Sequence, residues 1–280
     1  MARLPVQKTL KMYVGGKFIR SESGRISPQK SADGSVMNVC FASRKDLRGS
    51  IENNRASQPG WAARTSYNRG QILYRLAEIL EGRLSTLPTS KRDSEAAVDR
   101  AVHHAGWSDK VTALLSTLNP VAATYVNYSL IRPLGVVLAI PAPADGLLGM
   151  VEALCHSAVM GNATTLLVDS SAAELATHLA EAMATSDFPG GVVNVLCGDI
   201  EGVLQTANIH DDLDGMLVTE GVLSEAALTK ARFEGATVMR RIVLRPGAKR
   251  AAGPNDLAQL SETQTVWMSA WEPSGGAAAY

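Results

Sequence analysis

Cysteine supplies the strongest nucleophile available to this chain, because a thiolate reacts readily near neutral pH. The three cysteines are Cys40, Cys155 and Cys197. Their number is odd, and their spacing matches no metal-binding pattern. Cys155 and Cys197 lie in apolar runs, where a cysteine usually serves as a small buried hydrophobic residue. The cysteines therefore predict no metal site, and their usage favours a reducing, cytoplasmic compartment.

Histidines and carboxylates are the other residues that could bind a metal or transfer protons. His103 and His104 are adjacent, so on a helix they face different sides and cannot easily bind one ion. Glu152 and His156 are four residues apart on a predicted helix, but no second glutamate or histidine nearby completes a zinc-protease pattern. We predict solvated or core-edge histidines, a surface pair at Glu152 and His156, and no metal site.

Composition excludes several classes of protein. The 280 residues are 46% hydrophobic, and 27 basic residues balance 27 acidic ones. A neutral chain without a basic stripe gives no electrostatic case for nucleic-acid binding. Residues 1–20 lack the apolar core of a signal peptide, and no run approaches the roughly 20 apolar residues of a membrane helix. We therefore expect neither nucleic acid nor membrane as a partner.

The first 118 residues mix a hairpin, helices and polar loops. Residues 11–20 predict a hairpin that turns at Gly15-Gly16, where glycine permits the backbone angles of a tight turn. Apolar residues recur at helical spacing in 68–83 and 94–105. The polar, turn-rich stretches 21–33 and 85–93 are predicted to be loops.

After residue 119 strands and helices alternate. The apolar run 134–140 is typical of a parallel strand buried on both faces. A helical period follows from Leu147 to Ala158, and residues 171–174 fit a capping box for a helix ending near Ala184. Further strands are predicted at 164–168, 192–197 and from 216. This alternation predicts an α/β fold with a Rossmann-like parallel sheet, flanking helices, and ligand sites at the carboxyl ends of its strands.

Several segments, in a fixed order, resemble the aldehyde dehydrogenases. They are RTSYNRGQILYRLAEILEGR (64–83), HHAGWSDK (103–110), NPVAATYVNYSLIRPLGVVLAI (119–140), GNATTLLVDSS (161–171), PGGVVNVLCGD (189–199), HDDLDGMLVTEG (210–221) and SETQTVWMS (261–269). The resemblance implies the family's nucleotide-binding fold plus a small β oligomerisation flap. Within the superfamily, the chain is most similar to a degenerate dehydrogenase domain or short subunit that is paired with a full-length enzyme.

The resemblance also implies where the chemistry would lie. In the family a cysteine thiolate attacks the aldehyde, hydride passes to a nicotinamide, and a carboxylate activates water. The cysteine belongs to a second domain between the region matching 216–221 and the closing strand. Here only about forty residues fill that interval, and no cysteine follows Cys197. We therefore expect no catalytic residue in this chain.

The oxyanion and cofactor positions are altered as well. The family's oxyanion asparagine falls on Ala144 or, with a one-residue shift, on Asp145, which cannot donate when ionised. Losing one such donor costs about a hundredfold in rate. The ribose-binding lysine and glutamate fall on Leu167 and Ser170. Glu220-Gly221 replaces the Gly-Ser that admits the pyrophosphate, and a carboxylate there repels phosphate. No cofactor is expected; NAD(P) is the alternative.

The oligomerisation flap, by contrast, is retained. By resemblance it combines the hairpin 124–133 with the last strand and lies against the catalytic domain of a neighbouring subunit. Such docking extends a sheet and covers its exposed edge. Tyr125, Tyr128, Val266 and Trp267 are the expected interface residues, whereas Trp107 is expected to pack within the subunit.

Three parts of the chain are predicted: a nucleotide-binding-type domain (1–221), a degenerate remnant and linker (222–260), and the oligomerisation strand with its tail (261–280). The leading hypothesis is a pseudoenzyme subunit that stabilises or regulates a full-length aldehyde dehydrogenase in a hetero-oligomer, or assembles with itself. The alternatives are an oxidoreductase component that binds NAD(P) and acts in trans, and a ligand-binding or scaffold module. Lack of the catalytic domain is also expected to leave a bare apolar face.

Overall fold

The computed structural model describes residues 6–31, 34–121 and 124–270. Its centre is a seven-stranded sheet in the order β12-β11-β8-β9-β10-β2-β3. The five parallel strands are β8 (Val136–Ile140), β9 (Ala163–Asp169), β10 (Val193–Gly198), β11 (Gly215–Thr219) and β12 (Arg241–Arg245). The antiparallel hairpin of β2 (Met12–Val14) and β3 (Lys17–Ile19) extends the sheet beyond β10. The sheet is therefore mixed, with a parallel centre.

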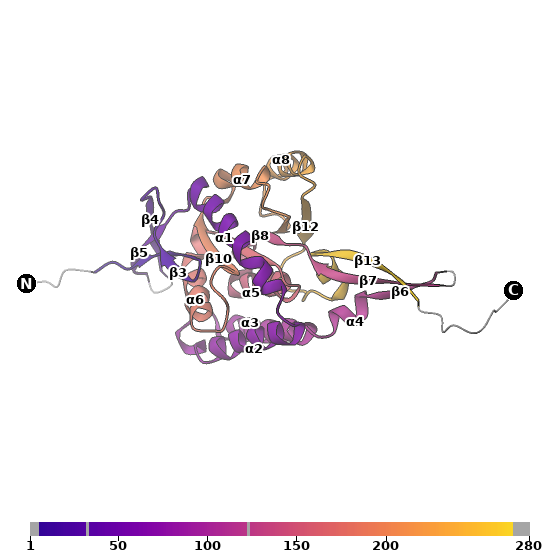
Figure 1. The fold of residues 1–280 in the computed structure, drawn as a ribbon. Helices are drawn as coiled ribbons and strands as arrows, with labels where there is room; N and C mark the ends of the chain where they lie inside the picture. The colour runs from indigo at the N-terminus through magenta and orange to yellow at the C-terminus, as the bar shows by residue number, and fades with distance from the viewer. Residues whose placement is uncertain (1–5, 32–33, 122–123, 271–280) are drawn as a thin grey trace, which may run out of the picture.

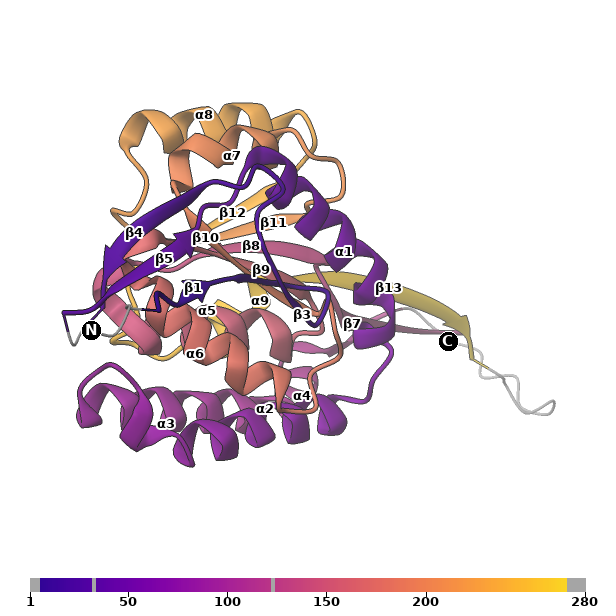
Figure 2. The ribbon, with the colours of Figure 1, turned by 90° about the vertical axis from the view of Figure 1, so that its left-hand side faces the viewer.

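Helices cover both faces of this sheet (Figure 2). One face carries α1 (Arg44–Ala62), α7 (Ile200–Asn208) and α8 (Glu225–Ala236). The other carries α5 (Gly146–Val159) and α6 (Ala173–Ala184), with α2 (Ser66–Glu81) and α3 (Lys91–Trp107) outside them. Strand β8 shows why its run is continuously apolar: Leu138 packs toward the first face and Ala139 toward the second. None of the described helices is both long and apolar enough to span a bilayer.

Two small sheets flank the central one. In the first, β5 (Val36–Cys40) lies between β1 (Thr9–Leu10) and β4 (Ile26–Lys30). The second, here called the flap, consists of β6 (Thr117–Asn119), β7 (Tyr125–Pro133) and β13 (Ser261–Ser269), with β7 in the middle. The flap extends away from the body of the molecule (Figure 1). The remaining short helices are η1 (Leu84–Thr86), α4 (Val111–Leu115), η2 (Pro143–Asp145), η3 (Ser170–Ala172) and α9 (Pro254–Ala258).

Most predicted elements are confirmed, including the hairpin at Gly15-Gly16, whose φ angles are +62° and +79°. Two local predictions are wrong. The loop predicted at 21–33 contains β4, and the capping box at 171–174 does not form, because Asp169 caps this segment by accepting from the amide of Ser171. Helix α1 is an addition to the predicted elements; its polar composition and internal Pro59 obscure the helical pattern.

Residues 222–260, predicted to be a degenerate remnant and linker, contain α8, β12 and α9. Strand β12 pairs in parallel with β11 along its whole length, from Gly215↔Arg241 to Thr219↔Arg245. The parallel sheet therefore continues past residue 221, and the chain returns from its edge directly to the flap.

Candidate functional site

The carboxyl ends of the parallel strands carry the altered positions. Ala144 is exposed in η2, directly after β8, and its side chain offers no hydrogen bond. Leu167 has none of its surface exposed and packs in the core on the α1 and α7 face. Ser170 begins η3 after β9, and Glu220 and Gly221 are exposed after β11. A buried leucine cannot bind a ribose. The position at which family members bind the ribose therefore cannot do so in this chain.

The start of α8 fits a pyrophosphate poorly. Ser224 caps this helix by accepting from the amide of Ala227, and the carboxylate of Glu201 accepts from the amide of Ser224 at 2.8 Å. Glu220 and Glu225 add carboxylates on either side of the cap. Negative charge already occupies the helix end where a dinucleotide phosphate would need positive potential. The described residues at these positions therefore do not fit the cofactor in the way that the family binds it.

The cysteines do not provide a nucleophile. All three are free and buried. Burial raises the pKa of Cys155 far above its ordinary value. Burial, with a smaller contribution from Asp169, raises the pKa of Cys197 to about 12. A thiol with such a pKa is protonated near neutral pH and is inert as a nucleophile.

Glu152 and His156 are not a surface pair, and this prediction is wrong. Glu152 is 6% exposed and His156 is completely buried. The Glu152 carboxylate binds Nη1 of Arg100 at 2.6 Å, Nε2 of His104 at 3.0 Å and Nη2 of Arg245 at 3.4 Å. His104 is also fully buried, so a solvated or core-edge position is wrong for both of these histidines. Trp107 packs against the core and donates to His103, as expected of an intrasubunit residue.

The charges of this cluster determine how it titrates. Burial alone would raise the pKa of Glu152, but the hydrogen bonds and charges of His104 and Arg100 outweigh it and lower that pKa to about 2. Burial lowers the pKa of His104 and also that of His156, the latter to about 4. Near neutral pH the cluster is therefore a carboxylate held by two arginines and a neutral histidine.

Residues 246–258, here called the strap, complete the cluster at the carboxyl end of β12. Asp256 binds Arg250 at 2.8 and 2.9 Å and Arg245 at 2.5 Å, and its carbonyl accepts from His156 at 2.9 Å. The amide of Ala252 donates to Glu152, and that of Ala248 to Asp145. Ala252 and Leu257 are fully buried, so the strap covers apolar surface at this end of the sheet where a bare face was predicted. No local sequence signal marked Arg100 or Arg245, because their shared partner Glu152 lies 52 and 93 positions away in the chain, and the sequence prediction missed Asp256 as well.

Residues 125–133, predicted to be part of a hairpin at 124–133, form the single strand β7, which pairs with β6 on one side and, as predicted, with the last strand on the other. Strand β13 pairs antiparallel with β7 over nine residues, from Ser261↔Pro133 to Ser269↔Tyr125. Successive residues of a strand point to opposite faces. One face carries Val126, Tyr128, Leu130, Leu118, Val266 and Met268, and we call it the apolar face.

The opposite face, here called the polar face, is crossed by a ladder of hydrogen bonds. Asn119 donates to Asn127 and to Ser129, and Ser129 bonds to Thr265 at 3.0 Å. The Tyr125 and Trp267 rings meet edge to face on this side, with centroids 6.3 Å apart. The four expected interface residues therefore divide into two pairs: Tyr128 with Val266 on the apolar face, and Tyr125 with Trp267 on the polar face.

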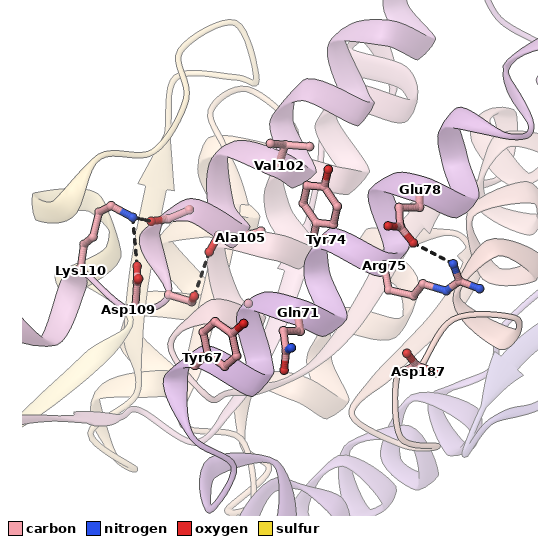
Figure 3. Close-up of a pocket in the computed structure, with 13 residues that line it drawn as sticks. Tyr67, Gln71, Tyr74, Arg75, Glu78, Val102, Ala105, Asp109, Lys110 and Asp187 are labelled. Carbon is pink, nitrogen blue, oxygen red and sulfur yellow. Dashed lines mark hydrogen bonds and ion pairs between the residues drawn. The ribbon is translucent and has the colours of Figure 1, made fainter.

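A groove between α2 and α3 lies on the outer surface of the helical layer, away from the strand ends (Figure 3). Tyr67 and Tyr74 form part of its α2 wall, and Val102 belongs to the α3 wall. Four of its charged groups form two ion pairs: Arg75 with Glu78 at 2.7 Å, and Lys110 with Asp109 at 3.0 Å. The remaining charged lining residue, Asp187, forms no ion pair with the described residues. The described residues also contain no group of three or more His, Cys, Asp or Glu side chains that could hold a metal.

Comparison with known proteins agrees with this architecture. A putative aldehyde dehydrogenase, DhaS, from Bacillus subtilis is 28% identical over 262 residues, which cover 87% of this chain and 52% of DhaS. An aldehyde dehydrogenase of Emericella nidulans is 25% identical over 260 residues, covering 87% of this chain and 48% of the relative. The chain thus spans about half the length of these relatives.

Solved structures share the fold. The NAD+ complex of an aldehyde dehydrogenase from Bacillus cereus superposes with a TM-score of 0.76 at 21% identity, over 85% of this chain and 50% of that one. PnpE from Pseudomonas sp. WBC-3 gives a TM-score of 0.76 at 24% identity, with the same coverage. The model of the aldehyde dehydrogenase family matches residues 18–264. Because this match spans far more than half of the sequence, the chain belongs to the aldehyde dehydrogenase family.

Proposed function

We propose that this chain is a non-catalytic subunit that docks through its flap onto a full-length, NAD(P)-dependent aldehyde dehydrogenase and stabilises or regulates it. The observation that carries the proposal is a complete three-stranded flap with an exposed apolar face. Leu118 is 77% exposed and Met268 is 51% exposed on that face. A projecting sheet with apolar side chains in water is a surface that a partner usually covers.

The chemistry of the remaining chain supports the same proposal. All three cysteines are buried, burial raises the pKa of Cys155 and of Cys197, and Ala144 replaces the oxyanion donor. Between β11 and β13, where the family places its catalytic domain, this chain has only α8, β12 and the strap. A flap retained beside so little catalytic machinery favours assembly over catalysis.

The decisive experiment is size-exclusion chromatography with light scattering on this chain alone and after co-expression with a full-length aldehyde dehydrogenase from the same source. The proposal expects co-elution in a fixed ratio and a changed thermal stability or activity of the enzyme. A stable monomer that ignores such enzymes contradicts the proposal. A homo-oligomer formed through the flap instead identifies a second copy as the partner.

A second candidate is an oxidoreductase component that binds NAD(P) and completes an active site in trans. Its support is the shared fold with the NAD+ complex from Bacillus cereus. The buried Leu167 and the carboxylates of Glu201 and Glu220 oppose it. Calorimetric titration of the isolated chain with NAD+ and NADP+ separates the two: micromolar binding favours this candidate, and no binding favours the non-catalytic subunit.

A ligand-binding or scaffold module is the remaining alternative. Its cleft was expected beside residues 142–146, where the strap now lies: Ala248 donates to Asp145 at 2.9 Å. The strap leaves this alternative with less support than the other two.

A further inference from the structure

A second cavity lies at the base of the flap, and the side chains that line it differ in kind from those at the strand ends and on the flap. It has a volume of about 250 Å3 and lies where the start of α2, helix α4 and the end of β7 meet. Three arginines, Arg64, Arg69 and Arg132, line it together with the hydroxyl residues Thr65, Ser66 and Thr112. No acidic residue is among its lining residues. We propose that this cavity binds the phosphate group of a small ligand, either free phosphate or a phosphate monoester.

Arg69 is the central observation. It is only 8% exposed, and its guanidinium donates to the carbonyls of Val159 at 3.2 Å and Arg64 at 2.6 Å. These acceptors are neutral, and no acidic side chain of the described residues lies within ion-pair distance of Arg69. A buried charge without a counter-charge is costly, and an anion in the cavity would supply the missing charge.

The other two arginines also have neutral partners. Arg64 donates to the side-chain carbonyl of Asn68 at 2.7 Å, and Arg132 to that of Gln264 at 2.6 Å. Both residues are exposed, and each guanidinium carries five N–H donors, so several donors on each remain for a ligand. Most other surface arginines that touch a side-chain acceptor in this chain pair with carboxylates, as Arg75 does with Glu78. Three arginines with only neutral partners around one cavity form a local excess of positive charge.

Helix α2 strengthens the site. It is 16 residues long and begins at the cavity, with Thr65 as its cap and Ser66 as its first residue. The amides of a first helical turn and the helix dipole favour an anion at this end. Guanidinium groups add planar, two-pronged hydrogen bonding that matches the oxygens of a phosphate. A phosphate bound here would touch both α2 and β7, and so would join the body of the protein to the flap.

The test is isothermal titration calorimetry of the isolated full chain, at low salt, with inorganic phosphate and with glycerol 3-phosphate. We expect saturable binding of at least one of them. The double variant Arg64→Gln/Arg132→Gln should weaken that binding by about tenfold or more, since each guanidinium contributes charge-assisted hydrogen bonds. Tighter binding of glycerol 3-phosphate identifies a monoester ligand, and equal binding identifies free phosphate.

Arg75→Gln is the matched control, because Arg75 lies on the same helix, is exposed, and does not line the cavity. It should leave phosphate binding unchanged. The amide resonance of Ser66 in an NMR titration should shift with phosphate in the wild type and remain still in the double variant. Absence of saturable binding of both ligands, or unchanged affinity in the double variant, overturns the proposal. These measurements need no partner enzyme, so their outcome does not depend on the proposed subunit function.

Discussion

The flap and the strap both border the parallel sheet, but the flap leaves its apolar side chains exposed, whereas the strap buries its own. The flap projects from the body and leaves Leu118, Val126 and Met268 exposed on its apolar face. The strap folds back onto the body, buries Ala252 and Leu257, and is held by the charges around Glu152. The flap therefore has apolar surface in contact with solvent, whereas the strap has its apolar surface packed against the same chain.

This difference indicates which family features the chain still needs. A closed strap allows the sheet domain to cover its core without the family's second domain. The open flap is the surface through which we propose that the chain associates with a partner. We infer that internal stability resides in the strap cluster. Association through the flap is the proposed function, and the predictions below test this division.

The largest effect is expected for Glu152→Ala. Removing the carboxylate leaves Arg100 and Arg245 buried without their shared partner, which costs about 3–5 kcal/mol of unfolding free energy. Urea denaturation followed by circular dichroism measures the change. The control is Glu220→Ala, an exposed carboxylate at the same end of the sheet, for which the change should stay within about 0.5 kcal/mol. A cost below about 1 kcal/mol for Glu152→Ala would show that the strap does not depend on this cluster.

The next effect concerns the apolar face of the flap. Val266→Asp places a charge beside Tyr128, and we expect it to weaken association with the partner by about 2 kcal/mol or more, or about thirtyfold. Light scattering and titration of the purified partner measure the loss. Thr263→Asp is the matched control, because it adds the same charge to the polar face of the same strand. Equal losses for the two variants would remove the distinction between the faces.

The strap cluster also predicts how stability depends on pH. The folded-state pKa of His156 is about 4, below its ordinary value of 6.5, so the unfolded chain takes up the proton first as the pH falls. Stability should therefore decrease from about pH 6.5 to 4, by about 1.4 kcal/mol per pH unit for such a histidine. Glu152, with a pKa lowered from 4.5 to about 2, continues the loss below pH 4.5.

Urea midpoints between pH 7 and pH 4 measure this slope. His156→Gln keeps a donor for the carbonyl of Asp256 and should make the slope shallower, since one titrating group is removed. A slope identical to that of the wild type would mean that His156 titrates normally. Association through the flap should hardly vary over the same range, because the exposed side chains of its apolar face, such as Leu118 and Met268, do not titrate there, and Glu262, on the same face of β13, is ion-paired with Arg241.

The smallest effect is expected for Trp267→Ala. Trp267 is 63% exposed and makes one edge-to-face contact with Tyr125, a kind of contact that contributes about 0.5–1.5 kcal/mol. If the apolar face docks, this variant should lower partner affinity less than Val266→Asp does. A larger loss for Trp267→Ala in the same titration would move the docking surface to the polar face.

Much of the fold can be predicted from short stretches of sequence. Residues 134–140 are apolar throughout because β8 is covered by helices on both faces, and a strand in that position has no polar side to show. The helical spacing in 68–83 appears in α2 for a related reason: only one side of it is buried. Where burial follows one simple period, the local sequence records it.

The strap cluster could not be predicted in this way. Glu152 has the spacing of a surface residue, yet it is buried because Arg100 and Arg245 approach it from 52 and 93 positions away in the chain. The environment of a charge depends on partners in space, and one window of sequence does not contain them. The cavity at the base of the flap is similar, since Arg64 and Arg132 line it together only where β7 passes the start of α2.

The flap shows both what the sequence can predict and what it cannot. By its resemblance to the family, the sequence determined that β7 and the last strand belong together, and the alternation of side chains already separates Tyr125 from Tyr128. The tertiary structure decided what each face became, because the register of β13 places Val266 beside Tyr128 and Trp267 beside Asn127. Pairing propensity is a local property of a strand, whereas the chemistry of a sheet face is shared among strands that are far apart in the chain.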